Sequence, residues 1–582
     1  MTSSEFSRSL LARRYSRRRL LRGAGVVLGG IAGAALVGCA DGGEGVTVGT
    51  ASATATPAAP TPTPAVAVPR FTDALRVAIE GAPSTLDPFA NASPSARTVA
   101  LHFYSRLFRA DTGPNRDPWA SGVVPDLAEG VETQDGQTWT VTLRQGAAFH
   151  RVEPINGRPL TAEDVVASVA RLQSVDSPVL ARLRHWTRVQ AVDGRTVRFT
   201  LAAPSADFLD ELADPTLLVV APREALEGAV DLAMTPVGSG PWMLQGRGEG
   251  GLRLIANPDL TGEAAPAVPV LELDDLAASV ALERFREGRL HVAGVRAEDV
   301  LPLRAEQHEV HWRGQVPPLT SFLYCSPEQG VPWRDERFRQ ALSLLQDRDA
   351  LTEAAYNLKA FRDAGLEAPV RWNNLLPAGF TRWWLDPASR DHGDTGRLFV
   401  HDPVEARRLL DAAGYDGSPI PFLLPADVYG PAFDVVADGI AAALSAGGVT
   451  LEVVRQDFAS EYLPRTFVGD FSGIAFGHQS PFTQVGDYFA RMFGRDETNH
   501  GRVRDEVIDD LVAAQAATLD ADERRPIIHD IQRRNAAGMY YVPAQAGVAP
   551  LWTAYQPYVR GIRLGRGAGV GAEVHPFLSL EG

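Results

Sequence analysis

Cysteine and lysine are almost absent from this chain of 582 residues. The only cysteines are Cys39 and Cys325, and the only lysine is Lys359. Once the N-terminal segment that holds Cys39 is set aside, a single thiol remains, which excludes an intrachain disulfide and a multi-cysteine metal site. Acidic residues outnumber basic ones by 71 to 56, for a formal net charge of −15. This balance argues against nucleic acid as a partner.

Long apolar runs are lacking too, and the one near the start covers only Ala24 to Val37. Because a membrane span needs ~20 apolar residues, this run is too short to cross a bilayer. The arginines at 17–19 precede it, and paired arginines before a short apolar core are typical of a twin-arginine export signal. The following Leu-Val-Gly-Cys at 36–39 resembles a lipobox. The sequence therefore predicts that residues 1–38 are a signal peptide and that Cys39 carries acyl chains; the alternative is a free signal peptide with an incidental cysteine.

Residues 39–69 contain no lysine, no aromatic residue and almost only small residues and proline before Arg70. Such a composition buries too little apolar surface to offset the entropy of ordering, so we expect a disordered tether. The mature protein is then expected outside the cytoplasm, held on the outer face of the cytoplasmic membrane by lipid alone. The remaining body is long enough for two or three domains.

The body mixes strand patterns with helix patterns and shows no repeat. Alternating apolar residues predict strands at 75–79, 139–143 and 196–201. Thr161 lies three residues before Asp164, and apolar residues follow at helical spacing, which predicts a capped helix. Asp402 opens a second predicted helix that ends near Gly414. We therefore expect an α/β fold with antiparallel pieces.

A longer pattern lies between residues 143 and 168, and reads LRQGAAFH at 143–150 and NGRPLTAEDVVAS at 156–168. Further segments follow the same order along the chain, namely STLDP at 84–88, PDLAE at 125–129, PVGSGPW at 236–242 and DERFRQALS at 335–343. Together they resemble the solute-binding proteins of peptide-type ABC transporters, family 5, the oligopeptide-, dipeptide- and nickel-binding group. The residues of the 143–168 pattern are expected to have structural roles rather than to contact ligand, with Thr161 as a helix cap and Gly157 and Pro159 as turn residues.

The resemblance implies a bilobed, type II periplasmic-binding-protein-like fold with an extra small domain and a hinge between the lobes. Lobe I would combine residues 70–110, 236–318 and 544–582, the small domain would be 111–235, and lobe II would be 319–543. A solute would be enclosed between the lobes and passed to ABC permease subunits. The same resemblance implies a monomer with no catalytic activity, no cofactor and no metal.

The stretch from Asp470 to Phe482 resembles the family segment in which a tryptophan lines the cleft and an aspartate pairs with the ammonium of a peptide. In ungapped register, His478 occupies the tryptophan position and Pro481 the aspartate position. Burying an ammonium without a carboxylate partner is costly. Either another acid, for which Asp487 is one candidate, takes this role, or the ligand lacks the amine. His478 could instead be a histidine satisfied within the lobe.

Other ligand-contacting candidates are carried over from the family by position only: Ala82, Pro83, Ser84, Tyr324, Trp383, Trp384, Phe476, Gln479, Ser480 and Phe482. The resemblance thus implies a receptor for a peptide or a peptide-sized solute. The missing aspartate adds the alternative of a non-peptide solute such as an oligosaccharide, an opine or a metal chelate.

Two rivals from other classes are a secreted hydrolase and a ligand sensor. The hydrolase is disfavoured because the sequence lacks an HExxH pattern, and the serine in Gly238-Ser239-Gly240 lacks the context of a nucleophile elbow. We expect that turn to be a crossover between domains. The glycine-rich segment 246–251 lies between two strand-like runs and is predicted to be a hairpin tip rather than a phosphate loop.

Overall fold

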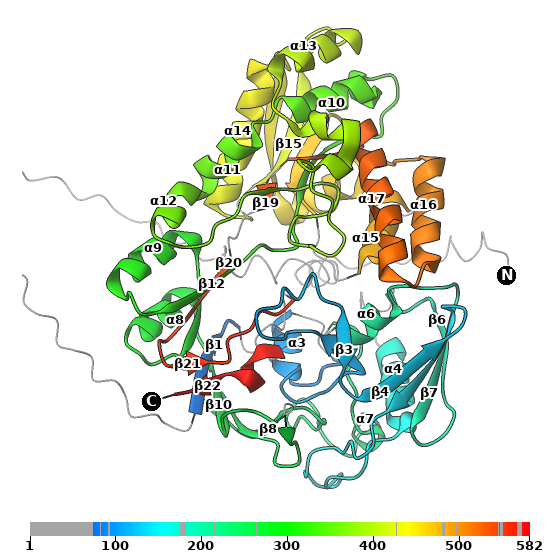
Figure 1. Cartoon of the computed structure of the whole chain (residues 1–582), viewed down its shortest axis with the longest axis vertical. Coiled ribbons are helices and arrows are strands. Elements are labelled where there is room, and N and C mark those ends of the chain that lie inside the picture. The colour runs from blue at the N-terminus through cyan, green and yellow to red at the C-terminus, as the bar shows by residue number, and fades with distance from the viewer. Residues whose placement is uncertain are drawn as a thin grey trace, which may run out of the picture.

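The computed structural model describes residues 74–581 apart from 82, 91–93, 175–181, 215, 249, 263–264, 427, 480–483, 495–498, 545, 548–550 and 567–572. The predicted signal peptide, the tether and Cys39 lie outside the described residues. The described chain forms one upper and two lower regions (Figure 1). Among the described residues, no helix is long and apolar enough to cross a membrane.

The first region, which we call lobe I, contains a mixed seven-stranded sheet with the order β12-β20-β11-β1-β10-β9-β8. Its strands are β1 (Ala74–Ile79), β8 (Trp242–Gly248), β9 (Gly251–Ala256), β10 (Val270–Asp275), β11 (Val292–Val295), β12 (His311–Gln315) and β20 (Leu551–Tyr555). β1 pairs in parallel with β10 and β11, and the other pairs are antiparallel. The helices of this region are α3 (Pro94–Ala100), α8 (Ala278–Arg286) and α9 (Ala297–Glu306). β8 and β9 form a hairpin, which confirms the prediction for the 246–251 segment.

The second region, lobe II, contains a five-stranded sheet with the order β16-β15-β17-β13-β18. Its strands are β13 (Ser321–Cys325), β15 (Ile420–Ala426), β16 (Leu451–Asp457), β17 (Ile474–His478) and β18 (Tyr541–Pro543). Its helices are α10 (Glu336–Leu344), α11 (Arg348–Tyr356), α12 (Leu358–Asp363), α13 (Pro403–Ala412), α14 (Pro431–Ala446), α15 (Val485–Phe493), α16 (Glu506–Ala517) and α17 (Ala521–Gly538). The helix predicted from Asp402 is confirmed, since the Asp402 carboxylate caps α13 by accepting from the Glu405 amide at 2.9 Å. A separate two-stranded sheet pairs β14 (Arg371–Trp372) with β19 (Ala546–Gly547).

The third region, the small domain, is built on a four-stranded antiparallel sheet, β4-β5-β7-β6. The strands are β4 (Ala128–Thr133), β5 (Thr138–Leu143), β6 (Trp186–Ala191) and β7 (Thr196–Leu201), and the helices are α4 (Ala162–Ser174), α6 (Phe208–Ala213) and α7 (Arg223–Leu226). Every second residue of β5 and β7 is buried, which confirms the two strands predicted from their alternation. Short pairs join β2 (Phe108–Ala110) to β3 (Val123–Pro125) and β21 (Val559–Arg560) to β22 (Ser579–Leu580).

The strands of these three sheets come from the segments predicted for lobe I, lobe II and the small domain, respectively. Helices together with sheets of parallel and antiparallel strands confirm the α/β prediction. The domain boundaries themselves stay a prediction.

The signature segment forms a buried polar junction around Asp164, which is fully buried on α4. Its carboxylate accepts hydrogen bonds from the Arg158 guanidinium at 2.9 and 2.5 Å, from the Thr161 amide at 2.9 Å and from the Arg223 amide at 3.0 Å. Thr161 was predicted to cap α4 with its own oxygen, but its hydroxyl instead donates to the Asp164 carboxylate at 3.0 Å. The segment therefore ties the loop before α4 to α4 and α7.

The turn at residues 238–241 brings the chain back into lobe I, as predicted. The Gly240 amide donates to the Phe103 carbonyl at 2.8 Å. A Cβ atom at Gly238 would lie 2.1 Å from that same carbonyl oxygen, so no larger residue fits without moving the backbone.

A buried ion pair joins the small domain to lobe II. The Arg524 guanidinium lies 2.8 Å from the Asp207 carboxylate, and the two side chains are only 3% and 9% exposed. The other Asp207 oxygen accepts from the Gly486 amide at 2.7 Å. The second residue of α15 and the first turn of α17 are thereby held against the start of α6.

Candidate functional site

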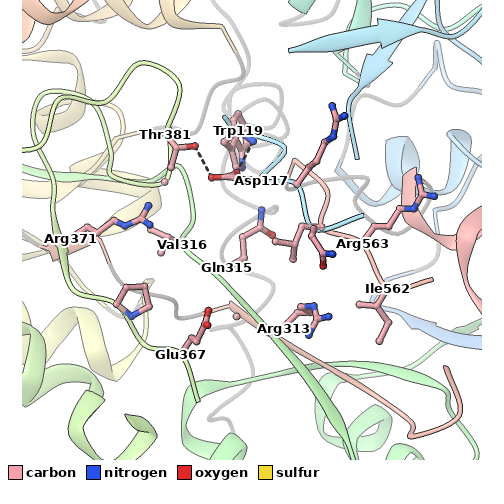
Figure 2. A pocket seen from close by; sticks show the side chains of 16 residues that line it. Asp117, Trp119, Arg313, Gln315, Val316, Glu367, Arg371, Thr381, Ile562 and Arg563 are labelled. Atoms are coloured by element: carbon pink, nitrogen blue, oxygen red, sulfur yellow. Dashed lines mark hydrogen bonds between the residues drawn. The ribbon is translucent and has the colours of Figure 1, made fainter. Parts of the chain in front are cut away.

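A cavity of about 420 Å³ lies where the three regions meet. Lobe I contributes the end of β12 and the segment after β21, the small domain contributes its first loop, and lobe II contributes the segment around β14. The lining residues are Asn115, Arg116, Asp117, Trp119, Arg313, Gly314, Gln315, Val316, Glu367, Pro369, Arg371, Gly379, Thr381, Ile562, Arg563 and Leu564. Figure 2 shows Arg371 and Thr381 on one side and Ile562 and Arg563 on the other, with Gln315 between them.

The cavity is cationic although the chain is acidic. Four arginines line it, against the two carboxylates of Asp117 and Glu367. Arg371 forms no ion pair and no side-chain hydrogen bond with any described residue. Its half-buried guanidinium is thus available to a carboxylate, which it can hold with two parallel hydrogen bonds.

The loop before Trp119 connects the small domain directly to lobe II at the rim of the cavity. The Asp117 carboxylate accepts from the Thr381 hydroxyl at 2.7 Å and from the Trp119 amide at 2.9 Å, and Figure 2 shows these three side chains together. The buried Trp119 ring packs on Phe380 with 5.3 Å between the ring centroids. This wall of the cavity is therefore held by contacts between two regions.

His478, at the end of β17, lies in an aromatic setting. Its Nδ1 atom is 2.6 Å from the Ser321 hydroxyl, and its ring centroid is 4.3 Å from that of Tyr429 and 4.9 Å from that of Phe433. Burial lowers the pKa of His478 to about 3. The imidazole is therefore neutral at physiological pH and already has a partner inside lobe II.

Several other predicted ligand residues are side chains of the protein core. Tyr324, Trp383 and Phe476 are 1%, 4% and 0% exposed. The Tyr324 hydroxyl bonds to the Tyr462 hydroxyl. Trp384 is half-buried and donates its indole N–H to the Trp372 carbonyl at 3.1 Å. Their role as ligand contacts stays a prediction.

Asp487 lies next to the small domain, and Gln479 lies next to His500 within lobe II. The Gln479 carbonyl oxygen is 3.4 Å from His500 Nε2, while its buried side-chain amide has no hydrogen-bond partner among the described residues. Asp487 lies 3.0 Å from Arg491 and 3.7 Å from Arg182. Its charge is thus already balanced by two arginines.

The loop after β1 leaves Pro83 half-buried and Ser84 exposed. Ala82, Ser480, Pro481 and Phe482 lie outside the described residues.

Among the predicted ligand residues that the structure describes, none lines the interlobe cavity. Its lining was missed because it comes from four short segments with no pattern of their own. One signal was present: residues 115–119 and 313–316 lie next to the predicted domain boundaries, where the chain must pass between regions.

The fold defines a class of protein, namely an α/β protein of two lobes and a small domain with a cavity where the three meet. Residues 122–500 match the family model described as "Bacterial extracellular solute-binding proteins, family 5 Middle". The chain belongs to this family of solute-binding proteins, which serve ABC importers outside the cytoplasm. Its homologues are binding proteins rather than enzymes.

Relatives and solved structures agree with this assignment. The chain is 26% identical over 471 residues to the probable D,D-dipeptide-binding periplasmic protein DdpA of Escherichia coli, covering 79% of this chain and 85% of DdpA. It is similar to the structure of HbpA2 from Haemophilus parasuis, with a TM-score of 0.72, 20% identity and coverage of 87% and 100%. It is also similar to AgaA from A. tumefaciens R10 in complex with agropinic acid, with a TM-score of 0.64, 22% identity and coverage of 88% and 99%. The predicted family and its bilobed fold are thereby confirmed.

Proposed function

We propose that this protein captures a carboxylate-bearing solute the size of a small peptide in the interlobe cavity and delivers it to an ABC permease. The observation that carries the proposal is the unpartnered guanidinium of Arg371 in a cationic cavity between lobes. The relatives support the same chemistry, since one is named for a D,D-dipeptide and another was solved with agropinic acid. A peptide and an opine acid both offer a carboxylate.

The cavity also offers a carboxylate that could replace the aspartate missing at position 481. A peptide ligand needs a carboxylate for its ammonium group, and the exposed Glu367 lies in the same cavity as Arg371. We assign Arg371 to the solute carboxylate and Glu367 to an ammonium, when the solute has one. A free peptide then binds without an aspartate at position 481, and an opine uses only the arginine side.

Binding of matched ligands tests this assignment. We expect a tripeptide with a free C-terminus, or agropinic acid, to bind in isothermal titration calorimetry, and the C-terminal amide of the same tripeptide to bind at least ~10-fold more weakly. Arg371→Gln should weaken binding of the acid by ~10-fold or more, because a hydrogen bond to a charged group contributes about 1.5–3 kcal/mol. Arg390→Gln is the control, since Arg390 is exposed and outside the cavity.

Two results would contradict the proposal. One is equal binding of the acid and the amide by the unaltered protein. The other is chemical conversion of the bound compound, followed by mass spectrometry, since a receptor releases its solute unchanged. Mass spectrometry of compounds that copurify with the native protein would name the solute directly.

We also propose that Cys39 anchors the protein through lipid. Cys39→Ser is expected to move the protein from the membrane fraction to the extracytoplasmic soluble fraction, because an acyl anchor contributes about 0.8 kcal/mol per buried CH₂ group. Cys325→Ser is the matched control, since that thiol is buried within lobe II and should leave the distribution unchanged. Retention of the Cys39→Ser protein on membranes would show that the anchor lies elsewhere.

A further inference from the structure

A second cavity, of about 270 Å³, lies between lobe I, the small domain and the C-terminal segment. It shares no lining residue with the interlobe cavity. Arg109 on β2 lines it from lobe I, Arg144 just after β5 lines it from the small domain, Ser239 lines it from the crossover turn, and Glu573 lines it from the C-terminal segment. Four segments far apart in the chain thus build one site.

One arginine of this cavity, Arg106, already has partners within the protein for its guanidinium group. Arg106, which is 4% exposed, donates to Glu573 at 2.7 Å and to the Ala213 carbonyl at 2.6 Å. The nearby Asp126 accepts from the Arg106 backbone amide at 2.8 Å. Arg106 and Glu573 therefore balance each other, and Asp126 is the remaining carboxylate that lines the cavity.

Two more arginines face this single carboxylate. Arg109 and Arg144 form no ion pair and donate no side-chain hydrogen bond to any residue that the structure describes. Both act on Asp126, since burial raises its pKa while Arg106, Arg109 and Arg144 oppose that rise. The cavity thus holds one net positive charge, which is unusual for a chain with a net charge of −15.

The cavity also contains hydrogen-bond donors that lack an acceptor. The Ser239 side chain is 1% exposed, and its hydroxyl forms no hydrogen bond within the described chain. The Nε atom of Arg144 is buried and likewise lacks a partner there. Leaving a buried donor unsatisfied costs about 1–3 kcal/mol, so buried donors normally have an acceptor.

We propose that this second cavity binds a small oxyanion, a phosphate or a small carboxylate, independently of the solute in the interlobe cavity. Arg109 and Arg144 would supply charge-assisted hydrogen bonds, and Ser239 would donate from the opposite wall. The space equals roughly nine water volumes of ~30 Å³ each, enough for such an anion with part of its hydration shell. A bound anion links the small domain, lobe I and the C-terminal segment, so it stabilises the junction of all three.

The test uses inorganic phosphate and the mature full-length protein. We expect phosphate to raise the thermal unfolding midpoint, since a ligand that binds only the folded state stabilises it, and sodium chloride at equal ionic strength not to do so. Isothermal titration calorimetry should detect phosphate binding, with Arg144→Gln weakening it by ~10-fold or more. Arg188→Gln on β6 is the control, since Arg188 is exposed and lies outside both cavities.

Two further variants make the result decisive. Ser239→Ala should weaken phosphate binding several-fold while the protein without phosphate keeps its unfolding midpoint, because the lost hydroxyl made no hydrogen bond there. Arg371→Gln should leave phosphate binding unchanged. The proposal is overturned if phosphate neither binds nor shifts the midpoint, or if Arg371→Gln, rather than Arg144→Gln, removes its effect.

Discussion

Replacing Asp164 by alanine is expected to lower the free energy of unfolding by about 3–5 kcal/mol, the cost of removing one partner of a buried ion pair. The Asp164 carboxylate accepts from two guanidinium N–H groups of Arg158, from the Thr161 amide and from the Arg223 amide. Burial alone would raise the pKa of Asp164, but these bonds outweigh burial and lower it. The ionised form is thus the one that the fold requires.

Urea unfolding followed by tryptophan fluorescence measures this loss. Glu163→Ala is the matched control, because Glu163 is the preceding residue on α4 and is exposed. Its effect should stay within ~0.5 kcal/mol. If both variants unfold at the same urea concentration, the polar junction at the signature segment does not stabilise the fold.

Acidification from pH 7 to pH 4 is expected to unfold the protein, because several histidines are buried in the neutral form. Burial lowers the pKa values of His102, His150, His291 and His392 from 6.5 to about 4. A group whose pKa is lower in the folded state than in the unfolded state stabilises the fold above pH 6.5 and loses that contribution as the pH falls toward 4. For one such histidine the loss is about 3 kcal/mol, so a few of them match the whole stability of a domain.

His150 shows why protonation is unfavourable. Its Nδ1 atom accepts from the Gly238 amide at 3.3 Å, and its Nε2 atom lies 3.0 Å from the Gly240 carbonyl. A proton on Nδ1 would remove the acceptor inside a tightly packed turn. Circular dichroism against pH should therefore show unfolding between pH 6.5 and 4, with a shallower dependence in His150→Gln. His308→Gln, at an exposed position, should keep the original curve; an unaltered protein that stays folded at pH 4 would contradict the expectation.

Local elements could be predicted from the sequence because their signals are local. The strands β5 and β7 follow from alternating residues, and α13 follows from Asp402 and Pro403 at its start. Tyr324 could not be placed in this way. It lies on β13, where all five residues are buried, so alternation does not separate a ligand-facing side from a core-facing side.

The cavity residues could not be predicted for a different reason. Arg371, Gln315 and Ile562 come from segments far apart in the chain, and only the tertiary fold brings them together. The family pattern pointed instead to the end of β17, where His478 bonds with Ser321 inside the lobe. The predicted contacts at the end of β17 and the residues of the interlobe cavity are thus separate candidates for the solute site.

The ion pair between Asp207 and Arg524 has a consequence for the unloading of the receptor. Both side chains have almost no access to solvent, so water cannot replace their contact until the small domain and α17 have already separated. Detachment at this point is therefore an abrupt step with its own barrier, rather than a gradual widening. In the proposed receptor, the time for which a solute stays bound then depends on this ion pair as well as on the contacts inside the cavity.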